Sequence, residues 1–180
     1  MKDDIRTYSG KVFRPLDPDP ALINIRDIAH ALSMEARWNG HTRVFYSVAE
    51  HSVRVSLITP AKDALWGLLH DASEAYLRDI PSPIKNAEAF SFYREAETRL
   101  MAAVAVAFGL PATIPAAVHR ADKIMLHTEA RDFFSSDVHA DWIDTGLAQP
   151  RRINPLGWQA AEAWFLQRYR ELDKRAKAAA

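Results

Sequence analysis

The sequence predicts an all-α protein, a single-domain helical bundle with a short non-helical N-terminal arm. Apolar residues recur at the spacing of one helix face through most of the chain, and prolines and glycines separate these stretches. The chain has 180 residues, of which 48% are hydrophobic and 26% are charged. It is therefore long enough and apolar enough to bury one core, as a globular domain does.

The arm is expected to cover about residues 1–20. Gly10, several prolines and a short alternating pattern indicate an extended segment or a small hairpin there. The core helices are expected between about residues 24 and 134. The first of them begins after Asn24, a candidate N-cap, because the apolar residues that follow share one helix face. A loop is expected at Trp38–Gly40.

The middle of the chain predicts four further helices. Ser47 and Glu50 match a capping box, so a helix is expected from Ser47 to Pro60, with His51 in its second turn. The next helix is expected over residues 60–77. Residues 79–85 contain two prolines and are not expected to continue as helix. Two longer helices are expected over about residues 87–108 and 114–134.

The C-terminal part predicts a loop and one last helix. Residues 135–154 are expected to form the loop. Asn154 and Pro155 are typical of a helix start, and the helix is expected over about residues 155–175. The residues expected to face inward from it are Trp158, Ala161, Phe165 and Tyr169.

Charge and cysteine content exclude several classes of protein. The chain has 23 basic and 23 acidic residues, so a nucleic-acid polymer, which requires clustered basic residues, is not an expected partner. The absence of cysteine excludes a disulfide framework and favours a reducing, cytoplasmic compartment. The uncharged stretch Leu100–Val118 has about the length of a membrane span, but Gly109 and two prolines interrupt it. No membrane span is expected.

Four residues carry the chemistry that the sequence indicates most strongly: His51, His70, Asp71 and Asp122. Imidazole and carboxylate are the ligands that borderline or hard divalent cations prefer. Each of the four lies inside an apolar helical pattern, so we expect three separate helices to bring them to one ion. Burying an unpaired carboxylate is costly, and coordination of a metal would offset that cost.

Two further acids follow the His70–Asp71 pair. Glu74 is four residues after His70 and three after Asp71, which places it on the same helix face. It would then project beside the ion, where a carboxylate can orient or deprotonate a water molecule. Asp79, at the expected end of that helix, is by itself typical of a solvated loop acid.

The order of these residues resembles the H…HD…D signature of the HD-domain phosphohydrolase superfamily. The stretch His70–Lys85, HDASEAYLRDIPSPIK, is similar to one branch of it, the bacterial 5′-deoxynucleotidases. The bare dyad is a weak motif, whereas the sixteen-residue stretch is highly specific. The likeness runs from Arg37 to the helix around Asp122, and it implies an HD-type helical bundle over residues 1–180.

The resemblance also implies roles for the matching residues. A single divalent metal would be bound by His51, His70, Asp71 and Asp122. Glu74 and Asp79 would position or activate the attacking water and assist the leaving group. Arg37 and Trp38 would line the pocket that checks for deoxyribose, and Lys85 would face phosphate.

His41 and Arg43 follow the Arg-Trp pair in a segment that departs from the family pattern. Both would be able to bind additional phosphates, which would favour a nucleoside triphosphate over a monophosphate as substrate. His119 lies one turn before Asp122, where an exposed helix histidine is favoured over an additional ligand.

The expected function is that of a metal-dependent phosphoric monoester hydrolase, which releases phosphate from deoxynucleoside 5′-monophosphates. The first alternative is a deoxynucleoside triphosphate triphosphohydrolase, and the second is a non-catalytic nucleotide-binding or sensor protein. Mixed nitrogen and oxygen ligands suit Mn, Fe, Co, Ni or Zn. The expected partners are a small-molecule deoxynucleotide and, from the family resemblance, further copies of the chain in a dimer or a larger homo-oligomer.

Overall fold

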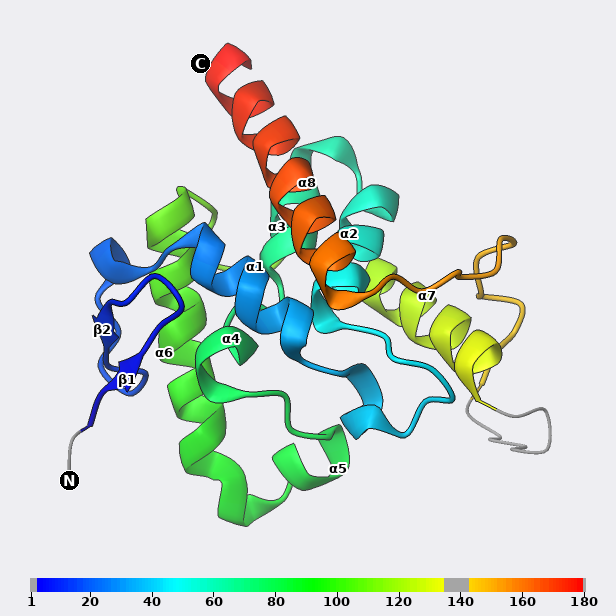
Figure 1. The fold of residues 1–180 in the computed structure, drawn as a ribbon, viewed down its shortest axis with the longest axis horizontal. Coiled ribbons are helices and arrows are strands. Elements are labelled where there is room, and N and C mark those ends of the chain that lie inside the picture. Colours follow the sequence, from blue (N-terminus) through cyan, green and yellow to red (C-terminus); the bar gives the residue numbers. More distant parts are fainter. Residues whose placement is uncertain (1–2, 135–142, 180) are drawn as a thin grey trace.

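The computed structural model describes residues 3–134 and 143–179, and the side chains up to residue 173. Within these residues the chain is mostly helical (Figure 1), which confirms the predicted all-α class. The α-helices are α1 Ile25–Met34, α2 Val48–Ile58, α3 Ala64–Leu69, α4 Glu74–Leu77, α5 Ser82–Lys85, α6 Ser91–Phe108, α7 Ala116–Phe133 and α8 Trp158–Ala179. None of these helices combines the length and the apolar character that crossing a bilayer requires.

The N-terminal arm is a small hairpin, one of the two forms expected. Strands β1 (Ile5–Arg6) and β2 (Val12–Phe13) are antiparallel, with Ile5 opposite Phe13. The hairpin is fixed to α1, because the Asp27 carboxylate accepts hydrogen bonds from the backbone N–H of Ser9 at 2.6 Å and from its hydroxyl at 2.8 Å. Phe13 is fully buried, so the arm contributes to the core.

Both predicted N-caps are confirmed. The Asn24 side chain accepts a hydrogen bond from Arg26 N, and Ser47 accepts one from Glu50 N. Glu50 does not complete a capping box, however. Its carboxylate is bound instead by Arg54 and by the backbone N–H of Leu156, which joins α2 to the segment before α8.

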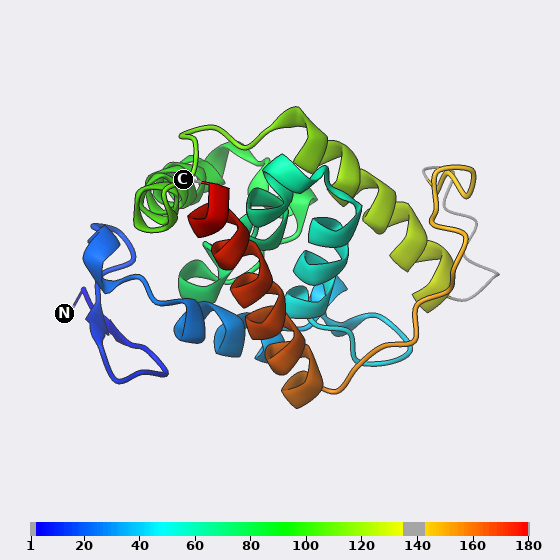
Figure 2. The same ribbon diagram turned by 90° about the horizontal axis from the view of Figure 1, so that it is seen from above.

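Helix α2 lies at the centre of the bundle, with α1, α3, α7 and α8 packed around it. Figures 1 and 2 show α8 crossing over α1 and α2, with α7 along the side of the bundle. Because α2 is enclosed in this way, it buries polar as well as apolar side chains, His51 among them. Buried polar groups require partners, and those of His51 form the site described below.

The helix predicted over residues 60–77 is interrupted. A short 3-10 turn (Ala61–Asp63) leads into α3, which ends at Leu69, and α4 begins only at Glu74. Between them the chain makes tight turns, in which Ala72 N bonds to Leu69 O and Glu74 N to Asp71 O. Adjacent residues on a regular helix point about 100° apart. The interruption therefore frees His70 and Asp71 from that geometry.

Residues 79–85 include a short helix that was not expected. Helix α5 begins at Ser82, with Pro83 in its first turn. A proline is tolerated there because the first N–H groups of a helix have no partner within the helix. The following long helix, α6, begins at Ser91, after a 3-10 turn at Glu88–Phe90, and not near residue 87.

The uncharged stretch Leu100–Val118 is divided as the glycine and prolines predicted. Helix α6 ends at Gly109, which adopts a left-handed conformation (φ 63°) and lets Leu110 N bond to Ala105 O. Most of the large apolar side chains of this stretch pack in the protein's own core, although Val106 is 71% exposed. The homo-oligomer remains a prediction.

The last helix begins at Trp158, three residues after the expected start. Ala161 and Phe165 are fully buried, as predicted, and Tyr169 packs against the core. The inward orientation predicted for Trp158 is wrong, since this residue is 36% exposed at the first turn of the helix. Of the expected loop, residues 135–142 lie outside the described residues, and the remainder has no regular structure apart from turns.

Gly67 permits the close approach of α3 to α2. A Cβ atom at this position would lie 2.8 Å from Thr59 Oγ1 and 3.0 Å from Ser56 Cα, a backbone atom that has little room to move. We expect Gly67→Ala to lower the free energy of unfolding by about 1–3 kcal/mol, the usual cost of overpacking a core. Urea denaturation measures it. Gly157→Ala is the control, because its Cβ would have an ordinary contact at 3.8 Å; equal stability of the two variants would contradict the prediction.

Candidate metal centre

The four residues predicted to bind a metal lie together, on three different segments. His51 comes from α2, His70 and Asp71 from the turn after α3, and Asp122 from α7. His51 Nε2 is 3.3 Å from His70 Nε2, 3.7 Å from Asp71 Oδ2 and 3.1 Å from Asp122 Oδ1. His70 Nε2 is 3.3 Å from Asp71 Oδ2 and 3.9 Å from Asp122 Oδ1. Two nitrogen and two oxygen atoms therefore surround one small volume.

The hydrogen bonds of both imidazole rings fix which nitrogen is free. His51 Nδ1 lies 2.5 Å from Glu129 Oε1, and His70 Nδ1 lies 2.9 Å from the carbonyl oxygen of Gly67. An oxygen acceptor at Nδ1 holds the proton on that nitrogen, so each neutral ring presents a lone pair at Nε2. Two lone pairs that face each other across 3.3 Å require a cation or a proton between them. Metal-binding histidines are oriented in this way.

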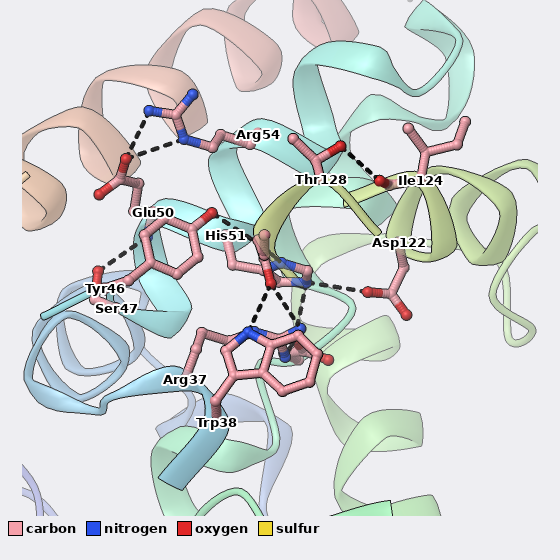
Figure 3. A network of polar contacts seen from close by, with 12 residues as sticks. Arg37, Trp38, Tyr46, Ser47, Glu50, His51, Arg54, Asp122, Ile124 and Thr128 are labelled. Carbon is pink, nitrogen blue, oxygen red and sulfur yellow. Dashed lines mark hydrogen bonds and ion pairs between the residues drawn. The ribbon is translucent and has the colours of Figure 1, made fainter. Parts of the chain in front are cut away.

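His51, His70 and Asp71 each offer a ligand atom, and these atoms all lie within 4.8 Å of one another. The group is therefore arranged to hold a metal ion. Asp122 lies beside it, with a side chain that is 41% exposed, so one side of the centre is open to solvent. Figure 3 shows Asp122 on one side of His51, with Arg37 and Trp38 on another.

The charges around the centre shift the pKa values of His51 and Asp122. Burial and the nearby Arg37 lower the pKa of His51, but Glu129 and Asp122 outweigh them and raise it to about 9. Although burial alone would raise the pKa of Asp122, its contacts with His51 and His70 lower it well below the usual range. The centre therefore binds positive charge, whether a proton or a metal ion.

Glu129 was not predicted from the sequence, although its carboxylate has four hydrogen-bond partners around the site. Its side chain is fully buried in α7 and accepts hydrogen bonds from four donors: His51 Nδ1, Tyr46 Oη, Arg37 Nη2 and Trp38 Nε1. Burial alone would raise the pKa of Glu129, but His51 and Arg37 lower it. The available signal was spacing, since Glu129 follows Asp122 by seven residues, which is two helix turns on the same face.

Arg37 and Trp38 lie in a 3-10 turn, Arg37–Gly40, at the edge of the centre. Arg37 is paired with Glu129 at 3.4 Å and with Asp71 at 3.8 Å, while its Nε is buried and has no hydrogen-bond partner in the part of the chain that the structure describes. Trp38 and Asn39 have left-handed backbones, with φ of 59° and 51°. Such a conformation costs about 1–2 kcal/mol per residue, so surrounding contacts must hold the turn.

A cavity of about 740 Å³ adjoins the centre at Arg37. Its lining comes from the Arg-Trp turn, the proline-rich segment and the C-terminal part of α7: Arg37, Trp38, Asn39, His41, Asp79, Pro81, Ser82, Pro83, Leu126 and Phe134. Trp38 packs edge-on against Phe134, with ring centroids 5.2 Å apart. Aromatic and apolar walls with a few polar groups are typical of a site for a small organic ligand, and the volume is in the usual range.

Glu74 and Asp79 occupy different environments. Glu74 is buried, and its Oε2 has no hydrogen-bond partner within residues 3–134 and 143–179. Burial together with Asp71 and Asp79 raises its pKa well above the usual value. Asp79 lines the cavity, where its backbone N–H donates to the buried carboxylate of Glu35. Glu74 is thus a buried acid with a free oxygen beside the centre, and Asp79 is an acid at the cavity wall.

The predicted basic residues are divided between the cavity and other partners. His41 lines the cavity. Lys85 is not among the lining residues, and its ammonium is paired with Glu97 at 2.8 Å. The Arg43 guanidinium contacts the carbonyl oxygen of Asp132 at 3.4 Å. His119 is exposed, as expected, and borders a second cavity of about 450 Å³ that reaches His70 from the other side.

The fold and the centre define a class: helical proteins in which a His/Asp cluster is arranged to hold a metal. No family model matches the sequence. The chain is 37% identical over 179 residues to the uncharacterized protein YfdR of Escherichia coli K12, and the alignment covers 97% of this chain and 98% of YfdR. It is 44% identical over 135 residues to the uncharacterized protein RCAP_rcc00048 of Rhodobacter capsulatus, over 70% of this chain and 68% of that one. The chain belongs to the same family as YfdR.

Proposed function

We propose that the protein is a metal-dependent phosphohydrolase of the HD type, which releases phosphate from 2′-deoxynucleoside 5′-monophosphates. The observation that supports this most strongly is the convergence of His51, His70, Asp71 and Asp122, with the two Nε2 atoms 3.3 Å apart. Their order in the sequence is that of the H…HD…D signature. The adjoining cavity has the size and the aromatic wall that a nucleoside requires.

The four ligands would hold one divalent ion and leave the exposed side at Asp122 open. Such an ion lowers the pKa of a bound water and neutralises charge at phosphorus. Glu74, whose buried Oε2 has no hydrogen-bond partner in the described part of the chain, would accept a proton from that water or orient it. Mixed imidazole and carboxylate ligands without thiolate favour Mn, Fe, Co, Ni or Zn.

The nucleoside would occupy the cavity beside the Arg-Trp turn. The Trp38 ring is held by Phe134 and by its hydrogen bond to Glu129, so this wall is fixed before a ligand binds. Asp79, on the same cavity wall, would lie near the leaving 5′-oxygen and assist its departure. A fixed wall excludes an additional hydroxyl by steric contact, which is how the pocket would select deoxyribose over ribose.

A triphosphohydrolase is the second candidate, supported by His41 at the cavity wall. Arg43, the other cation predicted to favour it, donates to a carbonyl oxygen at the end of α7, and Lys85, which was predicted to face phosphate, is paired with Glu97. Three linked phosphates carry more charge than one histidine balances. The arrangement therefore favours the monophosphate.

Product analysis with dAMP, AMP and dATP tests the proposal on the purified protein, reconstituted in turn with each candidate metal. We expect inorganic phosphate from dAMP, release from AMP about 10- to 100-fold slower, and loss of both after chelation of the metal. Tripolyphosphate from dATP, with dAMP intact, would support the second candidate. Binding of dAMP without turnover under every metal would support a non-catalytic sensor.

A further inference from the structure

We propose that Glu129 is a positioning residue that couples the metal centre to the Arg-Trp turn, so that metal binding and the conformation of the cavity wall depend on one carboxylate. Glu129 has no place in the metal-ligand set or in the motif that suggested the function. The proposal rests on the proposed function only in assigning nucleotide to the cavity. Its test by metal binding is independent of turnover.

The two oxygens of Glu129 serve different parts of the site. Oε1 accepts hydrogen bonds from His51 Nδ1 at 2.5 Å and from the Tyr46 hydroxyl at 3.0 Å. Oε2 accepts from Trp38 Nε1 at 3.3 Å and from Arg37 Nη2 at 3.4 Å. One oxygen therefore orients a metal ligand, and the other holds two residues that line the cavity.

The position of Glu129 leaves it no alternative partner. The side chain is fully buried on α7, two turns after Asp122, and all four donors come from other segments. A buried carboxylate that accepts hydrogen bonds from four donors is rigid. If the carboxylate rotates to shorten the hydrogen bonds at one oxygen, the hydrogen bonds at its other oxygen are broken. A change in the bond to His51 is therefore transmitted to Trp38 and Arg37.

The Arg-Trp turn depends on such support. Its two left-handed residues, Trp38 and Asn39, adopt a conformation that bulky side chains rarely take. The Trp38 indole N–H donates to Glu129, its ring packs edge-on against Phe134, and its carbonyl oxygen accepts a hydrogen bond from His41 N. Loss of the Glu129 bond removes the contact that joins the Trp38 side chain to the carboxylate behind His51.

The first test is Glu129→Gln, measured by calorimetric titration with Mn²⁺ or Co²⁺. The amide keeps the shape of the side chain but accepts through one oxygen only, so its NH₂ group opposes either His51 and Tyr46 or Arg37 and Trp38. We expect metal affinity to fall by about 10- to 100-fold, the usual effect of removing a carboxylate behind a metal-binding histidine. Unchanged affinity would overturn the proposal.

The second test is the fluorescence of Trp38, obtained as the difference between the wild-type protein and Trp38→Phe. Metal binding at His51 Nε2 strengthens donation from Nδ1 to Glu129 and so changes the field at the indole N–H. We expect saturating metal to alter this difference signal in the wild-type background. In the Glu129→Gln background the signal should not respond, even at saturating metal; a full response there would overturn the coupling.

Glu50→Gln is the matched control. Glu50 is also a fully buried carboxylate, adjacent to His51 in sequence, but among the described residues its carboxylate is bound by Arg54 and Leu156 N and not by the predicted metal ligands. The Glu50→Gln variant therefore measures how the loss of a buried negative charge in general affects metal affinity and the Trp38 signal. We expect Glu50→Gln to leave metal affinity and the Trp38 response unchanged; an effect equal to that of Glu129→Gln would reduce Glu129 to a structural role.

Discussion

The variant His70→Ala is expected to lose metal binding and with it phosphate release from dAMP. His70 supplies one of the two Nε2 atoms that meet at 3.3 Å, and it belongs to the group of ligand atoms that lie within 4.8 Å of one another. Because a bound metal supplies several kcal/mol of transition-state stabilisation, we expect turnover to fall by about 10³-fold or more. Metal content by plasma emission spectroscopy and phosphate release measure the two effects.

His119→Ala is the control for His70→Ala. His119 is an exposed histidine one turn before Asp122, and it borders the second cavity together with His70. Its removal tests whether any histidine near the centre matters. Full metal content in His70→Ala, or equal loss in both variants, would contradict the assignment of His70 as a ligand.

The variant Glu74→Gln is expected to keep its metal and lose turnover. Glu74 is buried, and its Oε2 has no hydrogen-bond partner among the residues that the structure describes. Removal of a general base lowers the rate by about 10²- to 10⁴-fold. Rates with dAMP at saturating metal measure it, and unchanged turnover would show that Glu74 does not handle the proton.

The same variant separates an enzyme from a sensor. A protein that only binds deoxynucleotides has no need of a proton acceptor beside the centre. Equilibrium binding of dAMP to wild-type and Glu74→Gln protein should therefore be similar in both cases, while turnover differs only if the protein is an enzyme. Glu97→Gln, which changes an acid at the wall of the second cavity, is the control for loss of negative charge.

Glu74 also affects the stability of the metal-free protein. Burial, Asp71 and Asp79 raise its folded-state pKa well above the ordinary value of 4.5. The folded state then binds the proton more tightly than the unfolded state, so the contribution of Glu74 to stability is present below pH 4.5 and is lost as the pH rises through the folded pKa. In metal-free protein we expect Glu74→Gln to raise Tm at pH 8 and to leave it nearly unchanged at pH 4.5.

The pattern of the sequence was sufficient to predict most of the secondary structure. Helical periodicity, the N-caps Asn24 and Ser47, and the break at Gly109 were all found where the residues indicated. These features depend on contacts within a few residues, and local sequence encodes such contacts directly. The errors include the regular helix over residues 60–77, the capping box at Glu50 and the inward orientation of Trp158, where tertiary packing overrides the local pattern.

By itself the sequence determined the all-α class and singled out four polar residues that lie together in the structure, because residue type and helical spacing identify polar groups on apolar faces. The tertiary structure alone decided how they meet. It placed His70 and Asp71 in a turn, brought the two Nε2 atoms to 3.3 Å from each other, and gave Lys85 and Arg43 partners elsewhere. It also showed that Glu129, an acid with no motif around it, accepts hydrogen bonds both from His51 and from the Arg-Trp turn. Such contacts join segments up to 92 residues apart, and their geometry depends on the packing of whole helices, which local spacing does not encode.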